Sequence, residues 1–250
     1  MNSKYLVSVV IPTYNRASFI ERCIKSLVEQ TYRPLEVLIV DDGSQDDTFK
    51  IIQKLVDNFE SKDFKILYFY QENMGAPFAR NKGIQESSGD WIQFIDSDDY
   101  IEDDQITKQV NELKKRNGDL AICDYKIVNK VNSSETLVKN NGNLLLRIAN
   151  GHSIFTGSAL IGRSIIKKGI LWNENLYREQ DKEFLFKVLF LSKSFIYNHN
   201  TYAMYIKHAQ TQITDIYSET KPQAIEIIKS NLKFSYVYRE FLDVKKFILI

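Results

Sequence analysis

Three carboxylates stand within four residues at Asp96, Asp98 and Asp99, directly after the apolar run WIQFI. Carboxylates this close repel one another, and a divalent cation that prefers hard oxygen ligands relieves the repulsion. The cluster therefore predicts a site for Mg2+ or Mn2+. A capped turn before the next helix is the structural alternative, because a solvated loop also tolerates such a cluster.

Two further polar groups could recognise a ligand. Asp41 and Asp42 begin the segment DDGS after the apolar run LEVLIV, and a carboxylate at a strand end can accept from a base N–H or a sugar hydroxyl. The same segment is also typical of a turn with a helix cap. Gly75 stands at the expected entrance of a helix that carries Arg80. A helix N-terminus favours anions and arginine pairs with phosphate, although Arg80 could equally be a surface residue of an amphipathic helix.

Alternating strands and helices would position these groups. Short β-branched apolar runs predict buried strands, and apolar residues at helical spacing predict helices between them. The expected strands are 6–11 (which Pro12 ends), 35–40, 64–70, 91–95 and 120–125, and the expected helices are 17–30, a segment around 51–56, 75–87 and 104–116. This order implies a parallel sheet with helices on both faces. The polar clusters at 13–15, 41–44 and 96–99 would then meet at the sheet edge where ligands bind.

The pattern after residue 126 is less regular. It predicts a loop or hairpin over 129–143, a strand over 154–161 and helices over 164–169 and 180–191. An extended segment over 194–205 and an apolar, lysine-rich helix over 222–250 complete the pattern. No repeat or linker interrupts the chain, so one domain with a C-terminal appendage is the simplest organisation.

Composition excludes several classes of protein. The 250 residues carry 33 Lys and Arg against 32 Asp and Glu, so no basic excess favours nucleic-acid binding. Cys23 and Cys123 are too few for a disulfide scaffold or a four-cysteine zinc site, and both are expected to be buried free thiols. The sequence shows no signal peptide, and no apolar run approaches the roughly 18 residues of a membrane span. We therefore expect a soluble, cytoplasmic protein.

Five ordered motifs closely resemble family 2 of the GT-A glycosyltransferases, the inverting nucleotide-sugar transferases. The motifs are VSVVIPTYNR (7–16), SLVEQT (26–31), LEVLIVDDGSQDDT (35–48), ENMGAPFARNKGI (72–84) and GDWIQFIDSDDYI (89–101). The resemblance implies an α/β GT-A fold, with a mostly parallel central sheet flanked by helices and a helical C-terminal appendage. It implies a catalytic domain over 1–215, with a nucleotide-binding half (1–125) and an acceptor half (126–215), followed by a helical segment over 216–250.

The resemblance also assigns roles in binding the donor. Pro12, Tyr14 and Asn15 would line the nucleotide pocket, and Asp41 would accept from the base, typically uracil N3–H. Arg80 would contact the nucleotide or its phosphates. These roles imply a nucleotide-sugar donor with a uridine diphosphate leaving group.

The carboxylate cluster matches the D-x-D motif of this family. Asp98 would be the direct ligand of Mn2+ or Mg2+ and Asp96 would lie nearer the ribose while sharing the metal site, although Asp99 leaves the assignment open by one position. His208 falls where such enzymes often carry a residue that contacts the diphosphate or the metal. Lys207 is the alternative, because the spacing differs by about one residue.

A late acidic pair carries the catalytic base in this family, and Gln180-Asp181 occupies its place here. Asp181 therefore inherits the role of general base, and Gln180 replaces the expected Glu. Glu179 stands one residue earlier and is the fallback if the register slips. Without the resemblance, Glu179 and Asp181 would be first-turn acids that complement a helix dipole.

The sequence leaves two rival functions and several possible partners. A nucleotidyltransferase would carry a Gly-rich basic loop after the first strand, where this chain has Pro12-Thr13-Tyr14-Asn15. A non-catalytic nucleotide-sugar-binding module is the second rival, and only Gln180 supports it.

The family implies a glycan or lipid-linked glycan acceptor of polysaccharide or lipopolysaccharide type. The apolar and basic segment 225–250 suits an anionic membrane surface at the inner face of the plasma membrane, and packing on the catalytic domain or a homodimer contact are its alternatives.

Overall fold

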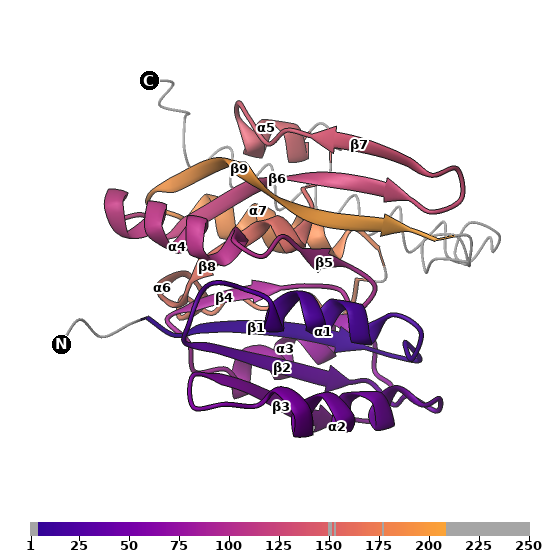
Figure 1. Cartoon of the computed structure of the whole chain (residues 1–250). Coiled ribbons are helices and arrows are strands. Elements are labelled where there is room, and N and C mark those ends of the chain that lie inside the picture. Colours follow the sequence, from indigo (N-terminus) through magenta and orange to yellow (C-terminus); the bar gives the residue numbers. More distant parts are fainter. Residues whose placement is uncertain (1–4, 150–151, 153, 177, 209–250) are drawn as a thin grey trace.

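The apolar runs of the first half form four parallel strands of one sheet (Figure 1). They are β1 (Val7–Thr13), β2 (Leu35–Asp41), β3 (Phe64–Tyr70) and β4 (Trp91–Phe94). β1 is the central strand of this group, because it pairs in parallel with β2 on one side and with β4 on the other. The computed structural model describes residues 5–149, 152, 154–176 and 178–208. The predicted segment 222–250 lies outside these residues.

Three helices connect these strands, as the sequence predicts. They are α1 (Ile20–Val28), α2 (Thr48–Phe59) and α3 (Ala76–Glu86). α1 and α2 cover one face of the sheet and α3 covers the other (Figure 1). Helix α3 approaches β1 closely at Gly83, where a Cβ atom would lie 2.2 Å from Cγ1 of Val10.

The second half adds strands of mixed direction. Its elements in chain order are β5 (Tyr100–Ile101), α4 (Gln105–Arg116), β6 (Leu120–Asn129), β7 (Ser134–Val138), α5 (Leu144–Ala149), a 3-10 turn (Thr156–Ser158), β8 (Ala159–Gly162), α6 (Arg163–Ile166), α7 (Gln180–Leu191) and β9 (Phe195–Lys207). β8 runs antiparallel between β4 and β6, and β9 runs parallel to β6. The strand order in the described residues is β3-β2-β1-β4-β8-β6-β9-β5, with β7 beside β6.

Several local predictions differ from the structure. Pro12 does not end the first strand, because β1 continues to Thr13. Pro12 also pairs with Val40 of β2, but the Val10 carbonyl accepts from the N–H of Ile95, so Val10 and Pro12, two residues apart, face the β4 side. Because β4 ends at Phe94, the missing N–H of Pro12 leaves no ladder bond unmade. The single strand expected over 154–161 is a 3-10 turn followed by the short β8. The segment expected as a loop or hairpin contains the β6–β7 hairpin.

Two hydrophobic clusters lie on opposite faces of the sheet. One joins the inward side chains of α1, α2 and α4 to β1 and β2, and the other joins α3, α5, α6 and α7 to the opposite face. Alternation along β1 divides its side chains, so that Val9 belongs to the first cluster and Val10 to the second. Cys23 and Cys123 are free and buried, as expected.

Candidate active site

The carboxyl ends of β1 and β2 meet at one edge of the sheet, because the two strands pair in parallel up to Thr13 and Asp41. Asn15 follows in a left-handed conformation (φ 51°). Its N–H donates to Ser44 Oγ at 2.9 Å, and its Oδ1 accepts from the N–H of Gln45 at 2.8 Å. The Asn15 side chain therefore joins the loops after β1 and β2, which fixes their relative positions.

The other two residues expected in the nucleotide pocket differ in exposure. Pro12 is buried within β1 and is therefore not exposed at this edge. The Tyr14 side chain is 42% exposed, so its ring is available to a planar ligand at this edge.

Asp41 is only 1% exposed, and both of its carboxylate oxygens already accept hydrogen bonds. Oδ1 accepts from the N–H of Ser44 at 2.8 Å, and Oδ2 accepts from the Tyr68 hydroxyl at 2.9 Å. Burial raises the pKa of Tyr68, and the hydrogen bond to Asp41 raises it further, so the hydroxyl stays protonated and donates. A base N–H that binds Asp41 would therefore have to share one of these oxygens.

Asp42 holds the entrance of α3. Its Oδ1 accepts from the N–H of Met74 at 2.9 Å and from Nε2 of Gln71 at 2.7 Å, and its Oδ2 accepts from the N–H of Gly75 at 2.7 Å. Gly75 has a φ of 101°, which favours glycine. Asp42 therefore fixes the loop directly before the first turn of α3, whose N-terminus is the expected anion site.

Arg80 joins three separated segments of the chain. Its side chain is 6% exposed, and Nη2 donates to Asp96 Oδ1 at 2.6 Å. Nη1 donates to Gln180 Oε1 at 3.2 Å, which connects α3 to the beginning of α7. The guanidinium carbon lies 4.3 Å from the centroid of the Trp172 ring.

Acidic neighbours keep the Arg80 side chain protonated. Burial acts to lower the pKa of Arg80, but Asp96 and Asp181 outweigh it, and the net shift is upward. This arginine therefore stays charged at the edge where β4 ends, between the carboxylate cluster and α7.

The three carboxylates after β4 lie in different environments. The Asp96 and Asp98 side chains are 36% and 23% exposed. Asp99 is 1% exposed, and its Oδ1 accepts from the N–H of Ile206 at 2.8 Å. Burial raises the pKa of Asp99 well above its ordinary value, and Asp98 and Asp96 add to the shift. Asp99 therefore ties the loop to β9, whereas Asp96 and Asp98 face the accessible side.

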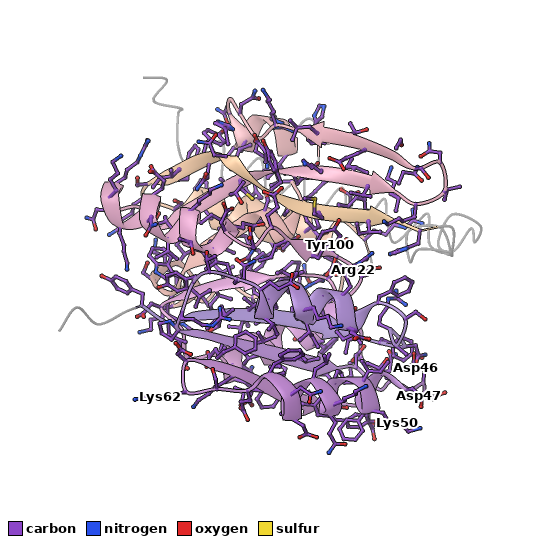
Figure 2. All side chains as sticks on the ribbon, viewed as in Figure 1. Arg22, Asp46, Asp47, Lys50, Lys62 and Tyr100 are labelled. Atoms are coloured by element: carbon purple, nitrogen blue, oxygen red, sulfur yellow. The ribbon has the colours of Figure 1, made fainter. Side chains whose placement is uncertain are left out.

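Two arginines of the β1–α1 region surround Asp98. Nε of Arg16 lies 3.9 Å from Asp98 Oδ2, and Nη2 of Arg22 donates to the Asp98 carbonyl at 2.6 Å. Figure 2 shows Arg22 beside Tyr100, whose ring centroid lies 5.0 Å from the guanidinium carbon. Figure 2 also shows Asp46, Asp47 and Lys50 together at the start of α2, away from Arg22 and Tyr100. Burial raises the pKa of Asp98, Asp96 raises it further, and Arg16 opposes the shift.

His208 lies at the same loop, although it follows β9. Its ring packs against Phe19, with the centroids 4.3 Å apart. Burial lowers the pKa of His208, and Arg22 and Arg16 lower it further. Lys207, the alternative residue, is exposed at the end of β9.

The two acids at the start of α7 point in different directions. Glu179 is exposed, has a left-handed φ of 60° at the N-cap, and pairs with Lys182. Asp181 stands in the first turn of α7, next to Gln180, whose Oε1 accepts from Arg80. Burial raises the pKa of Asp181, Arg80 opposes the shift, and Asp96 adds to it. Of the two acids, Asp181 is therefore the one that shares the electrostatic environment of Arg80 and Asp96.

Sequence reasoning missed several residues of this arrangement. Arg16 and Arg22 lie in or beside the quoted motifs, but nothing local indicated that they contact the carboxylate cluster. Tyr68, on β3, donates to Asp41. A tyrosine in an apolar strand was the one available signal for Tyr68, because a buried hydroxyl needs a partner.

The family model of glycosyl transferase family 2 matches residues 8–202, which include most of the sheet and the candidate site residues from Pro12 to Asp181. The chain belongs to glycosyl transferase family 2. A protein of Haemophilus influenzae named as an uncharacterized glycosyltransferase is 29% identical over 96% of this chain and 98% of its own length. A cholesterol galactosyltransferase of Borreliella burgdorferi is 32% identical over 70% of this chain and 49% of its own length. The glycosyltransferase GlyA of Streptococcus pneumoniae is matched over only 17% of its length.

Solved structures show that this family 2 chain has the GT-A fold. The TarS fragment of S. aureus in complex with UDP-GlcNAc matches 89% of this chain and 66% of that fragment, with a TM-score of 0.69 and 22% identity. The mannosyltransferase of Pyrobaculum calidifontis with GDP-Man and Mn2+ matches 81% of this chain and 57% of its own, with a TM-score of 0.63 and 20% identity. The mixed sheet with helices on both faces is the architecture that these proteins share with this chain.

The residues present fit a divalent cation that the substrate helps to bind. In the described part of the chain, no three His, Cys, Asp or Glu side chains converge closely enough to hold a metal by themselves. Mg2+ in phosphate-transfer sites is typically bound by one or two carboxylates together with substrate phosphates. Asp96 and Asp98 are two partly exposed carboxylates of this kind.

None of the helices in the described ranges combines the length and apolar character that crossing a membrane requires.

Proposed function

We propose that this family 2 protein is an inverting, metal-dependent glycosyltransferase. It would move a sugar from a nucleoside diphosphate donor to a hydroxyl of a glycan or lipid-linked glycan. The observation that carries the proposal is the position of Arg80, whose buried guanidinium joins Asp96 to the beginning of α7, where Asp181 lies. A donor-side carboxylate, a phosphate-binding cation and a candidate base thus lie around one point.

The donor is proposed to carry uridine diphosphate. Asp41 stands at the end of β2, in the base-reading position of the family, and Tyr14 offers an exposed ring beside it. Among the structural neighbours, TarS binds UDP-GlcNAc whereas the Pyrobaculum enzyme binds GDP-Man, so the fold accepts both nucleotides. Asp41 favours uracil over cytosine, because its carboxylate can accept from uracil N3–H whereas cytosine N3 carries no proton.

The proposed chemistry is in-line displacement at the anomeric carbon. Asp181 would accept the proton of the acceptor hydroxyl as that oxygen attacks from the face opposite the leaving group, which inverts the configuration. Its raised pKa suits a base that must bind a proton near neutral pH. Arg80 would bind the diphosphate, and its charge is secured by Asp96.

Asp98 and Asp96 would hold Mn2+ or Mg2+ together with the diphosphate oxygens. The bound cation supplies charge stabilisation to the departing nucleoside diphosphate. Arg16 Nε lies 3.9 Å from Asp98 Oδ2. If this carboxylate bound the cation, Arg16 would no longer pair with it, and the Arg16 charge would be available to the phosphates. His208 would remain packed against Phe19.

The location and partners are proposed from the family and the sequence. We propose a cytoplasmic protein that contacts the inner face of the plasma membrane through residues 225–250, with a homodimer contact as the alternative use of that segment. Liposome flotation of the full chain and of a chain ending near Lys221, with and without anionic lipid, tests this idea. Loss of flotation in the shorter chain supports membrane contact, and equal behaviour of the two chains rejects it.

The transfer proposal is tested with a panel of UDP-sugars, with Mn2+ and after chelation. We expect hydrolysis or transfer that needs Mn2+ and is inhibited by UDP more strongly than by GDP or CDP. Metal-dependent UDP binding without turnover of any donor would instead indicate a non-catalytic binding module. A clear preference for GDP would reject the assignment of Asp41.

A further inference from the structure

The side chain of Asn81, on α3, binds both backbone polar groups of a residue 91 positions away. Its Oδ1 accepts from the N–H of Trp172 at 2.8 Å, and its Nδ2 donates to the Trp172 carbonyl at 2.9 Å. The same Nδ2 donates to Glu174 Oε1 at 2.9 Å. Trp172 lies outside the helices and strands, so a side chain satisfies the peptide groups that secondary structure would otherwise satisfy. Asn81 therefore fixes the Trp172 backbone to α3.

The Trp172 ring contacts Arg80, the residue that precedes Asn81. Its centroid lies 4.3 Å from the Arg80 guanidinium carbon, and the ring also stacks on Phe184 of α7, with the centroids 4.1 Å apart. Trp172 is 2% exposed, and its Nε1 has no hydrogen-bond partner among the residues that the structure describes. A buried unpaired N–H is costly, and an apolar side chain would avoid that cost. The ring face is therefore the specific contact of Trp172, and tryptophan attracts a cation more strongly than other aromatic residues do.

Arg80 keeps donor capacity that its protein partners do not use. A guanidinium has five N–H donors, of which Nη2 donates to Asp96 and Nη1 donates to Gln180. Within the described residues, the buried Nε has no partner. Of the two acceptors, only Asp96 is charged, because Gln180 accepts through a neutral amide. The Arg80 guanidinium therefore retains N–H groups for a second anion, and arginine binds phosphate oxygens through such groups.

Arg80 and Asn81 hold the segment before α7 at two points. Asn81 binds Trp172 at the beginning of that segment, and Arg80 binds Gln180 at its end. Gln180 also donates from Nε2 to the Leu176 carbonyl at 2.8 Å, which ties the end of the segment to its middle. Two adjacent residues of one helix thus bind both ends of the segment. The position of the Arg80 guanidinium therefore depends on the Asn81–Trp172 contact.

We propose that Trp172 and Asn81 are positioning residues for Arg80. Asn81 fixes the Trp172 backbone, and the Trp172 ring holds the guanidinium beside Asp96 and Gln180 in one orientation before the donor binds. A cation that is already fixed loses less side-chain entropy when it binds a diphosphate. The proposal rests on the proposed role of Arg80 in binding the donor diphosphate.

The ratio of UDP affinity to uridine affinity isolates this effect. Both ligands carry the same base and ribose, and only UDP carries the groups that Arg80 is proposed to bind. A partly unfolded variant weakens both ligands by the same factor, so the ratio does not depend on the folded fraction. At saturating Mn2+, we expect calorimetric titration to give a ratio about 3- to 30-fold lower in Trp172→Leu, as the loss of a buried cation–π contact predicts. Trp172→Phe keeps an aromatic face, so its ratio should fall less.

A double-substitution cycle shows whether Trp172 acts through Arg80. We expect Trp172→Leu to lower the ratio in the wild type and not in Arg80→Met, where the contact is already absent. An equal fall in both backgrounds, or an unchanged ratio in Trp172→Leu, overturns the proposal. Asn81→Leu removes the groups that bind the Trp172 backbone and should also lower the ratio. A wild-type ratio in Asn81→Leu would remove Asn81 from the proposal.

Phe186→Leu is the matched control for lost core packing. Phe186 is a buried residue of α7 in the same hydrophobic cluster as Trp172, and its ring stacks on Phe190. We expect Phe186→Leu to lower Tm and to leave the ratio of the two affinities unchanged. A ratio as low as that of Trp172→Leu would mean that loss of packing alone explains the effect, which also overturns the proposal.

Failure of the underlying function is recognised separately. A wild-type protein that binds UDP no more tightly than uridine contradicts the proposed donor. An Arg80→Met variant that keeps the wild-type ratio contradicts the assignment of Arg80 to the diphosphate. A preference for UDP that Arg80→Met loses and Trp172→Leu keeps rejects the positioning role alone.

Discussion

Replacing Asp181 by Asn tests the proposed base most directly, because the amide keeps the size of the carboxylate and cannot take a proton. A positioned general base contributes about 10²- to 10⁴-fold to a rate, which corresponds to about 3 to 5 kcal/mol of transition-state stabilisation. We therefore expect kcat for sugar transfer to fall by that factor in Asp181→Asn. UDP affinity, measured by calorimetric titration, should stay near the wild-type value, because the base acts in the chemical step.

The same variant makes a prediction about stability with a definite sign. Burial raises the pKa of Asp181 in the folded state, so the folded protein binds this proton more tightly than the unfolded chain does. The stability from that proton is complete below the unfolded pKa and is lost as the pH rises through the raised folded pKa. At neutral pH the ionised carboxylate therefore destabilises the fold, and the amide removes this effect. We expect Tm of Asp181→Asn to equal or exceed that of the wild type.

Glu179→Gln is the matched control for the base. Glu179 is exposed and pairs with Lys182 at the surface, and such pairs contribute about 0 to 1 kcal/mol. We expect kcat to stay within about twofold of the wild type and Tm to change little, as for most surface substitutions. An inactive Glu179→Gln beside an active Asp181→Asn would refute the assignment. A Tm several degrees lower in Asp181→Asn would refute the electrostatic argument.

Three further substitutions test other parts of the site and fold. Asp98→Asn should abolish Mn2+-dependent transfer and weaken Mn2+ binding in the presence of UDP, as followed by electron paramagnetic resonance, and wild-type binding would exclude Asp98 as a ligand. Tyr68→Phe leaves a buried oxygen of Asp41 without its donor, so urea unfolding should report a loss of about 1 to 3 kcal/mol, and an unchanged midpoint would mean that Asp41 finds another donor. Gly83→Ala places a Cβ atom 2.2 Å from Cγ1 of Val10, so calorimetry should show a loss of about 1 to 3 kcal/mol through overpacking. An unchanged Tm in Gly83→Ala would mean that α3 can move away from β1 without loss.

Local sequence patterns predicted the first half of the fold because each element there depends on its own residues. The run Phe64–Tyr70 is β3 as predicted. In the second half, the helical pattern of Gln180–Leu191 is α7 as predicted. The direction of β8 could not be predicted, because an apolar strand of four residues pairs equally well in either direction and its partners β4 and β6 lie far away in the sequence. The short β5 carries too few residues for any periodicity, and only its pairing with β9 makes it a strand.

The sequence by itself determined which chemical groups reach the carboxyl edge of the sheet, because Asp41 and Asp96 directly follow strands whose ends must meet there. Only the tertiary structure decided how each group is used. In the folded chain, Asp99 is buried and bonded to β9, whereas Glu179 is exposed and pairs with Lys182. The fold also joins Arg80 to Gln180, which stand 100 residues apart. The physical reason is that a buried polar group must be hydrogen bonded, so its partners limit what else it can bind. Those partners come from elements that meet only when the sheet and helices have packed.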